Sequence, residues 1–144
     1  MEGECKIFFV FDNDDNTESL WADKIGDYYE LKNVPFFSRG ISLGDIVEAK
    51  LLNGNLMYNK TISSSGHSTY RIYSFDNDKL DFFWKILSQL GCTYERATEN
   101  LYAIDVPSES DVYKVYEVLE LGEKRGAWEF EEGHCGHPLS ESTT

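Results

Sequence analysis

Residues 35–75 read PFFSRGISLGDIVEAKLLNGNLMYNKTISSSGHSTYRIYSF, and this segment holds three predicted strands separated by glycine-containing turns. The strands are expected over residues 46–52, 56–62 and 69–75. Between the first two stands Asn53-Gly54, the dipeptide most typical of a two-residue β-hairpin turn. The segment therefore predicts antiparallel β-structure at the centre of the chain.

The residues before this segment extend the same pattern. A compact apolar run over 6–11 predicts a first strand, and Asp12-Asn13-Asp14-Asp15-Asn16 predicts the acidic turn that ends it. A further hairpin is expected around Ile25-Gly26-Asp27. Residues 1–68 are therefore predicted to form an all-β N-terminal half, either a small β-sheet or a partial barrel.

After Asp76 the apolar period changes from two to 3.6. A first helix is expected from an N-cap at Asp78 to Gly91, and a second from a capping box between Ser108 and Asp111 to either Gly122 or Gly126. Strands are expected over 92–96, 101–106 and 127–131.

The order of these elements is β-α-β-β-α-β, which predicts a ferredoxin-like unit over residues 69–132 with both helices on one face of its sheet. The fold class is thus α+β. No linker rich in Pro, Gly or Ser separates the halves, so they are expected to pack as one body, with the 69–75 strand pairing with or adjoining the N-terminal hairpins. Residues 133–144 are predicted to be a flexible tail.

The charge of the chain is strongly negative. Among 144 residues, 26 are acidic and 13 basic, which gives a formal net charge of −13. Such a field repels nucleic acid and anionic membranes and favours basic protein partners, although the same charge also serves solubility. The N-terminus lacks the pattern of a signal peptide, and three widely spaced cysteines favour reduced thiols, so a cytoplasmic location is expected.

Four short motifs carry a resemblance to a known family: LWA (20–22), NVPFF (33–37), GISLGDIV (40–47) and SGHSTYR (65–71). With these motifs the chain resembles the bacterial family called domain of unknown function 4265. The resemblance implies a small bacterial cytosolic protein, and it supplies no catalytic residues.

Two groups of residues contain chemically versatile side chains. The loop around His67, with nearby hydroxyl, carboxylate and guanidinium groups, has the residue types of a hydrolytic or small-molecule site, although the same residues commonly bind loop amides instead. His134-Cys135-Gly136-His137 offers three metal-ligand types but lacks the second cluster of a structural zinc site. We therefore predict no metal and no cofactor, and the alternative ligand site comprises Asp45, His67, Ser68 and Arg71.

The acidic residues support a different hypothesis, in which the protein is not an enzyme. A compact acidic protein of the immunity or antitoxin type can occlude the cationic cleft of a basic toxin, most simply a nuclease. We expect the partner to meet clustered carboxylates, in one turn, at one helix start and along one strand: Asp12, Asp14, Asp15, Asp76, Asp78, Glu129, Glu131 and Glu132.

Overall fold

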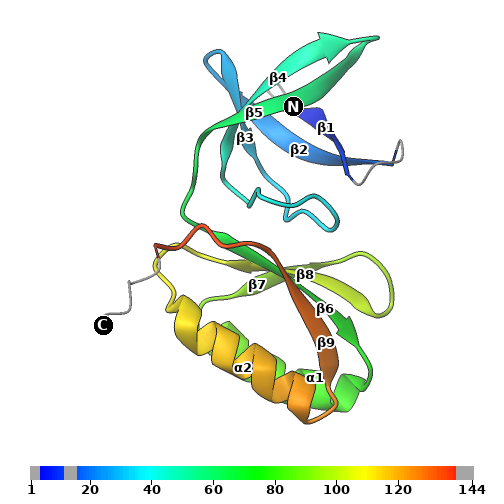
Figure 1. Ribbon diagram of the computed structural model, residues 1–144, viewed down its shortest axis with the longest axis vertical. Helices are drawn as coiled ribbons and strands as arrows, with labels where there is room; N and C mark the ends of the chain where they lie inside the picture. The colour runs from blue at the N-terminus through cyan, green and yellow to red at the C-terminus, as the bar shows by residue number, and fades with distance from the viewer. Residues whose placement is uncertain (1–3, 12–15, 139–144) are drawn as a thin grey trace.

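The computed structural model describes residues 4–11 and 16–138, which form a barrel and a separate helix-covered sheet (Figure 1). The barrel is closed and takes its strands from the first half of the chain: β1 (Glu4–Val10), β2 (Thr17–Ile25), β3 (Tyr28–Leu31), β4 (Ile46–Leu52) and β5 (Asn55–Ser63). Buried apolar side chains fill it, among them Ile7, Leu31 and Val47.

The second half forms a four-stranded antiparallel sheet in the order β7-β8-β6-β9. Both helices cover one face of this sheet, and the barrel lies on the side of the opposite face (Figure 1). The predicted α+β class is confirmed. No described helix has the length and apolarity that crossing a membrane requires. The elements are β6 (Ser68–Ser74), α1 (Asn77–Gln89), β7 (Thr93–Arg96), β8 (Leu101–Val106), α2 (Val112–Lys124) and β9 (Trp128–His134).

The β4–β5 hairpin explains why the barrel closes. Asn53 and Gly54 both adopt positive φ angles, 53° and 85°, as a type I′ turn requires. Register shifts within the hairpin, at Ile46/Val47 and Glu48/Ala49, bend and twist it. β5 thereby reaches β1 and pairs with it in parallel, which closes the barrel. The sequence had predicted either a small sheet or a partial barrel.

An aspartate caps the N-terminus of each helix, although the caps differ from those that the sequence predicted. The Asp76 side chain accepts hydrogen bonds from the backbone N–H groups of Asp78 and Lys79, so Asp76 caps α1 and the prediction of Asp78 is wrong. Asp111 caps α2 by itself, in place of the predicted box with Ser108. α2 ends before Gly126, whose φ of +81° suits a residue that follows a helix.

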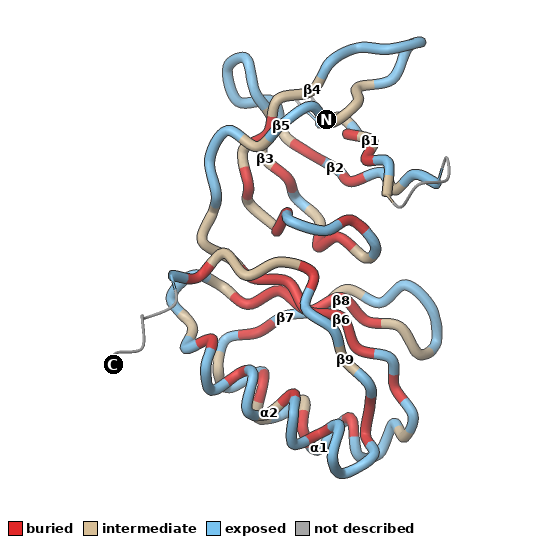
Figure 2. The backbone as a smooth tube through the Cα atoms, in the orientation of Figure 1, coloured by how far each residue is buried: buried red, intermediate tan, exposed pale blue. Residues whose placement is uncertain are grey.

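The two halves are coupled by a loop segment and not by strand pairing. β6 pairs with β8 on one side and β9 on the other, so of the two expected arrangements pairing with the N-terminal hairpins is wrong, and β6 instead adjoins residues 38–42 of the N-terminal half through side-chain hydrogen bonds. Residues 32–45, here called the interlayer segment, run between the barrel and the sheet and contain many buried residues (Figure 2). Gly40 N donates to Gly133 O at 3.0 Å, which joins this segment to β9.

The chain beyond residue 132 is more ordered in its described part than the predicted tail. β9 continues to His134, and the side chain of His137 is only 8% exposed. Residue 136 packs directly against the backbone of His67. Only glycine fits there, because a Cβ would overlap the carbonyl oxygen of His67. Residues 139–144 lie outside the described part of the chain.

Candidate functional site

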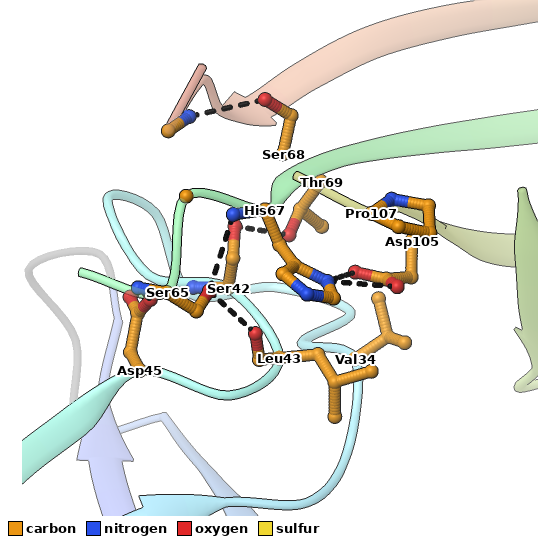
Figure 3. A network of polar contacts seen from close by, with 12 residues as sticks. Val34, Ser42, Leu43, Asp45, Ser65, His67, Ser68, Thr69, Asp105 and Pro107 are labelled. Carbon is orange, nitrogen blue, oxygen red and sulfur yellow. Dashed lines mark hydrogen bonds and ion pairs between the residues drawn. The ribbon is translucent and has the colours of Figure 1, made fainter. Parts of the chain in front are cut away.

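Polar side chains gather between the barrel and the second sheet, where two apolar surfaces would be expected to meet (Figure 3). They come from the interlayer segment, the loop before β6, and the strands β6 and β8. We call this set the interlayer network. Hydrogen bonds, most of them between residues far apart in the sequence, hold its members: Ser42, Asp45, Ser65, His67, Ser68, Thr69 and Asp105.

Asp45 is fully buried and joins two loops. Its Oδ2 accepts the backbone N–H of Ser42 at 3.0 Å, and its Oδ1 accepts that of Ser65 at 2.9 Å. Ser65 Oγ in turn donates to the carbonyl oxygen of Leu43 at 2.8 Å. Both oxygens of the Asp45 carboxylate are therefore engaged with backbone, which gives this residue a loop-fixing role.

His67 and Asp105 form the most chemically suggestive pair of the network. His67 Nδ1 lies 2.9 and 3.0 Å from the two carboxylate oxygens of Asp105, and the imidazole points toward that carboxylate (Figure 3). The side chain of Asp105 is 3% exposed, whereas that of His67 is 24% exposed. Burial raises the pKa of the Asp105 carboxyl above its ordinary value of 3.8, while the hydrogen bond from His67 opposes that shift.

The raised pKa of Asp105 predicts a pH dependence of stability. Because the native state holds this proton more tightly than the unfolded state, the stability contributed by Asp105 is lost as pH rises through the folded-state pKa. We expect the free energy of unfolding of the wild type, measured relative to Asp105→Asn, to decrease as pH rises above the ordinary carboxyl pKa of 3.8 and through the folded-state pKa. Urea titrations at several pH values measure this difference, and an increase over that range would contradict the assignment.

Two further histidines act as connectors. His137 Nε2 donates to the carbonyl oxygen of Pro107 at 2.8 Å, so its Nδ1 accepts the hydroxyl of Ser68 at 2.6 Å. The same Ser68 hydroxyl oxygen accepts the backbone N–H of Gly136 at 3.0 Å. His134 Nδ1 lies 2.8 Å from Ser42 Oγ. These contacts bind the end of the described chain to the network.

Arg71 is buried, with 4% of its surface exposed, and binds the interlayer segment. Its Nε donates to the carbonyl oxygen of Phe36 and its Nη2 to that of Ser38. From the other side, the carboxylate of Glu18 on β2 accepts the backbone N–H groups of residues 36, 37 and 38, at 2.6, 3.2 and 2.9 Å. The Arg71 cation thus binds carbonyl oxygens of this loop, and the Glu18 anion binds its backbone N–H groups. Burial lowers the pKa of the Arg71 guanidinium.

The four residues of the predicted alternative ligand site lie in or beside this layer but bind separate partners. Asp45 binds loop amides, His67 binds Asp105, Ser68 binds His137, and Arg71 binds the interlayer segment. Five clefts of about 210 to 550 Å³ among the described residues are lined without Asp45, His67 or Ser68, and Arg71 lines one of them. No serine hydroxyl is described within hydrogen-bonding distance of the His67 ring, so a Ser-His-Asp triad is absent from the described residues.

The predicted metal-ligand cluster does not converge either. His134 and His137 bind serine hydroxyls, and Cys135 Sγ lies 3.7 Å from the carbonyl oxygen of His137. Over residues 4–11 and 16–138, no group of three or more His, Cys, Asp or Glu residues has the arrangement of a metal site.

The acidic residues predicted to bind a partner have diverse surroundings. Asp76 caps α1, and Asp78 lies in the first turn of that helix. Glu129 is exposed on β9, whereas Glu131 pairs with Arg39 at 3.2 Å and lies 3.8 Å from Arg71. Glu132 accepts the hydroxyl of Tyr70 at 3.3 Å. Asp12, Asp14 and Asp15 lie outside the described residues.

The most spacious of these clefts, about 550 Å³, lies where the barrel meets the interlayer segment. Aromatic rings dominate its wall, and Phe37 is half exposed there. Two stacked pairs, Phe9 with Tyr58 and Phe11 with Phe37, have ring centroids 4.8 and 5.2 Å apart. The Arg39–Glu131 ion pair borders this cleft, so its polar groups already neutralise each other.

The sequence matches the family model described as domain of unknown function (DUF4265) over residues 18–130. The chain belongs to this family. The match runs from Glu18 on β2 to Phe130 on β9 and covers the interlayer segment and all seven residues of the interlayer network. The resemblance seen in the short motifs is therefore confirmed for most of the chain.

The fold of this family member is also similar to a solved structure. The chain resembles a hypothetical protein from Neisseria gonorrhoeae, with a TM-score of 0.81 and 20% sequence identity. The similarity covers 94% of this chain and 97% of that one, and it extends across both the barrel and the second sheet. No curated protein matches the chain.

Proposed function

We propose that this family member is a protein-binding inhibitor of the immunity or antitoxin type, which neutralises a basic bacterial toxin by occluding its active site. The observation that carries the proposal is the net charge of −13. Nucleases must expose cationic clefts to hold phosphate, and a compact anionic protein complements such a cleft in charge.

The distribution of ion pairs supports the same proposal. Among the described residues, the carboxylates paired with basic side chains are Asp23, Glu30, Asp105 and Glu131. Other carboxylates in the described part of the chain, such as Glu117, Glu120 and Glu129, are exposed and are not in this set. Their charge is available to attract a partner, and such long-range attraction raises the association rate and makes it sensitive to salt.

Two structural assignments accompany the proposal. We assign residues 69–132 to a ferredoxin-like unit, which the chain order β6-α1-β7-β8-α2-β9 and the sheet order β7-β8-β6-β9 support. We also assign the protein to the cytoplasm, which the free thiols of Cys5, Cys92 and Cys135 support.

A second candidate function is hydrolysis or small-molecule binding at the His67 loop. The His67–Asp105 pair favours it, because a carboxylate-oriented imidazole is a common general base. His67 lines none of these five clefts of the described residues, which counts against it. His67→Ala separates the two candidates, since it abolishes turnover or ligand binding in the second and leaves partner binding unchanged in the first.

Capture of a partner tests the inhibitor proposal. The tagged wild-type chain is purified from cells that carry its neighbouring genes, at low and at high salt. We expect a basic protein to be retained in stoichiometric amount at low salt and released at high salt, because the attraction is electrostatic and partly exposed. Retention of no protein at either salt, or of a partner whose binding does not respond to salt, would contradict the proposal.

A further inference from the structure

A second cleft, between α2 and the second sheet, combines aromatic rings with unpaired carboxylates. It measures about 390 Å³ and lies between the N-terminal half of α2 and the end of β9. We call it the tyrosine cleft. Its wall includes Tyr70, Tyr113, Tyr116, Glu117, Glu132 and Cys135.

The rings of this cleft are held by packing. Tyr70 is 2% exposed, and its centroid lies 6.3 Å from that of Tyr116, with the ring planes inclined by 61°. Tyr116 also packs edge-to-face on Phe130, at 5.5 Å and 80°. Tyr116 nevertheless keeps 41% of its surface exposed, and Tyr113, one turn earlier on α2, keeps 49%. Rigidly placed, partly exposed rings can bind a ligand without first losing side-chain freedom.

The carboxylates of the tyrosine cleft give it an anionic character. Within the described part of the chain, neither Glu117 nor Glu132 forms an ion pair with a basic side chain. Glu132 Oε1 accepts the Tyr70 hydroxyl, which leaves the other oxygen of that carboxylate for a further donor. Burial raises the pKa of the Tyr70 hydroxyl, so Tyr70 remains a neutral donor at physiological pH and fixes the orientation of Glu132.

We propose that the tyrosine cleft binds the guanidinium group of an arginine side chain of the basic partner, a proposal that rests on the inhibitor function. Aromatic faces attract cations through their quadrupoles, and a guanidinium can stack on a tyrosine while donating to a carboxylate. Arginine fits this combination better than lysine, because its planar group offers several donors in a fixed arrangement. An anionic ligand would meet two carboxylates, and an uncharged apolar one would desolvate them without compensation.

A peptide titration tests the cleft without the partner. The probe is acetyl-Arg-Arg-Arg-amide, and its matched control is the same peptide with citrulline, which keeps the shape but lacks the charge. In ¹⁵N NMR spectra we expect saturable shifts at Tyr113, Tyr116, Glu117 and Cys135 with the arginine peptide alone. Shifts spread evenly over all acidic surfaces, or equal shifts with citrulline, would overturn the proposal.

Variants locate the binding within the cleft. Glu117→Gln and Glu132→Gln are each expected to weaken binding of the arginine peptide by about fivefold, the size of one partly desolvated ion pair. Glu120→Gln makes the same charge change one turn further along α2, outside the cleft, and is expected to have a smaller effect. Tyr116→Phe keeps the ring and should retain binding, whereas Tyr116→Leu should lose it. Equal effects of Glu117→Gln and Glu120→Gln would reduce the site to general charge attraction and overturn it.

Capture of the partner by the wild type and by the double variant distinguishes failure of this inference from failure of the proposed function. If the wild type captures a basic partner and the Glu117→Gln/Glu132→Gln variant captures it equally well, the cleft is not the anchor and this inference fails while the inhibitor function stands. If no partner is captured but the arginine peptide saturates the cleft, the inhibitor function fails and a cation-binding cleft remains. Circular dichroism and unchanged NMR dispersion verify that each variant is folded.

Discussion

Replacing Arg71 with methionine is expected to lower the free energy of unfolding by about 3 kcal/mol or more. Methionine fills much of the same volume but donates no hydrogen bond. The carbonyl oxygens of Phe36 and Ser38 would lose the donors that satisfy them beneath the interlayer segment. The Arg71 guanidinium also occupies the space that a Cβ at position 133 would need, so this position requires glycine. Urea denaturation followed by tryptophan fluorescence measures the change.

Arg39→Met is the matched control for Arg71→Met. Both arginines approach the carboxylate of Glu131, but the Arg39 side chain is 66% exposed and that of Arg71 only 4%. An exposed ion pair contributes little in water, so the Arg39 change should cost less than about 1 kcal/mol. If the two variants lost similar amounts of stability, the interlayer role of Arg71 would be wrong.

Gly122→Ala is the second substitution with a large expected effect. It is expected to lower the free energy of unfolding, although replacing glycine with alanine within a helix usually raises it. Within a helix, alanine is favoured over glycine by about 1 kcal/mol. At this position of α2, however, a Cβ would overlap the indole of Trp128, which is fully buried and donates from Nε1 to the carbonyl oxygen of Leu119 at 2.9 Å. We expect a net destabilisation of about 2–3 kcal/mol, typical of overpacking in a core.

A double-mutant cycle with Trp128→Phe identifies the cause. The closest atom that a Cβ at Gly122 would meet is Cζ2 of Trp128, in the outer six-membered ring of the indole, which a phenylalanine side chain does not reach. Gly122→Ala should therefore cost far less in the Trp128→Phe background than in the wild type. The same cost in both backgrounds would mean that helix backbone effects, not contact with Trp128, explain the loss.

Local signals in the sequence predicted most strands and both helices. Asn53-Gly54 specified its hairpin because both residues accept positive φ, and the 3.6-residue period of Leu80, Phe83 and Leu87 specified the buried face of α1. The predicted cap of α1 was wrong, because two aspartates, Asp76 and Asp78, stand near the start of this helix. Backbone geometry, which no local pattern displays, makes Asp76 the cap.

The interlayer network could not be assembled from the sequence, because its bonds join residues far apart in the chain. His67 and Asp105 are separated by 38 positions, and Glu18 reaches the interlayer segment across about 20. One signal was present. On the predicted strands, Arg71 and Asp105 alternate with apolar residues such as Tyr70 and Ile104, which predicts a polar face on the side away from the helices.

The tyrosine cleft was missed for a similar reason. Tyr70 comes from β6, Tyr116 from α2 and Glu132 from β9, and only the fold brings them together. The sequence grouped Glu129, Glu131 and Glu132 as one acidic strand. The structure separates them, because Glu131 pairs with Arg39 while Glu132 contacts Tyr70. A partial signal lay in the spacing of Tyr113, Tyr116 and Glu117, which share one side of a helix.

The most direct measurement of the inhibitor proposal is the activity of the partner captured at low salt, assayed during titration with the wild-type chain. The account predicts that nuclease activity falls to the background level near an equimolar ratio, and that high salt restores it, because carboxylates occupy the cationic cleft. Full activity of the partner when it is saturated with the chain would contradict occlusion of the active site as the function of this protein.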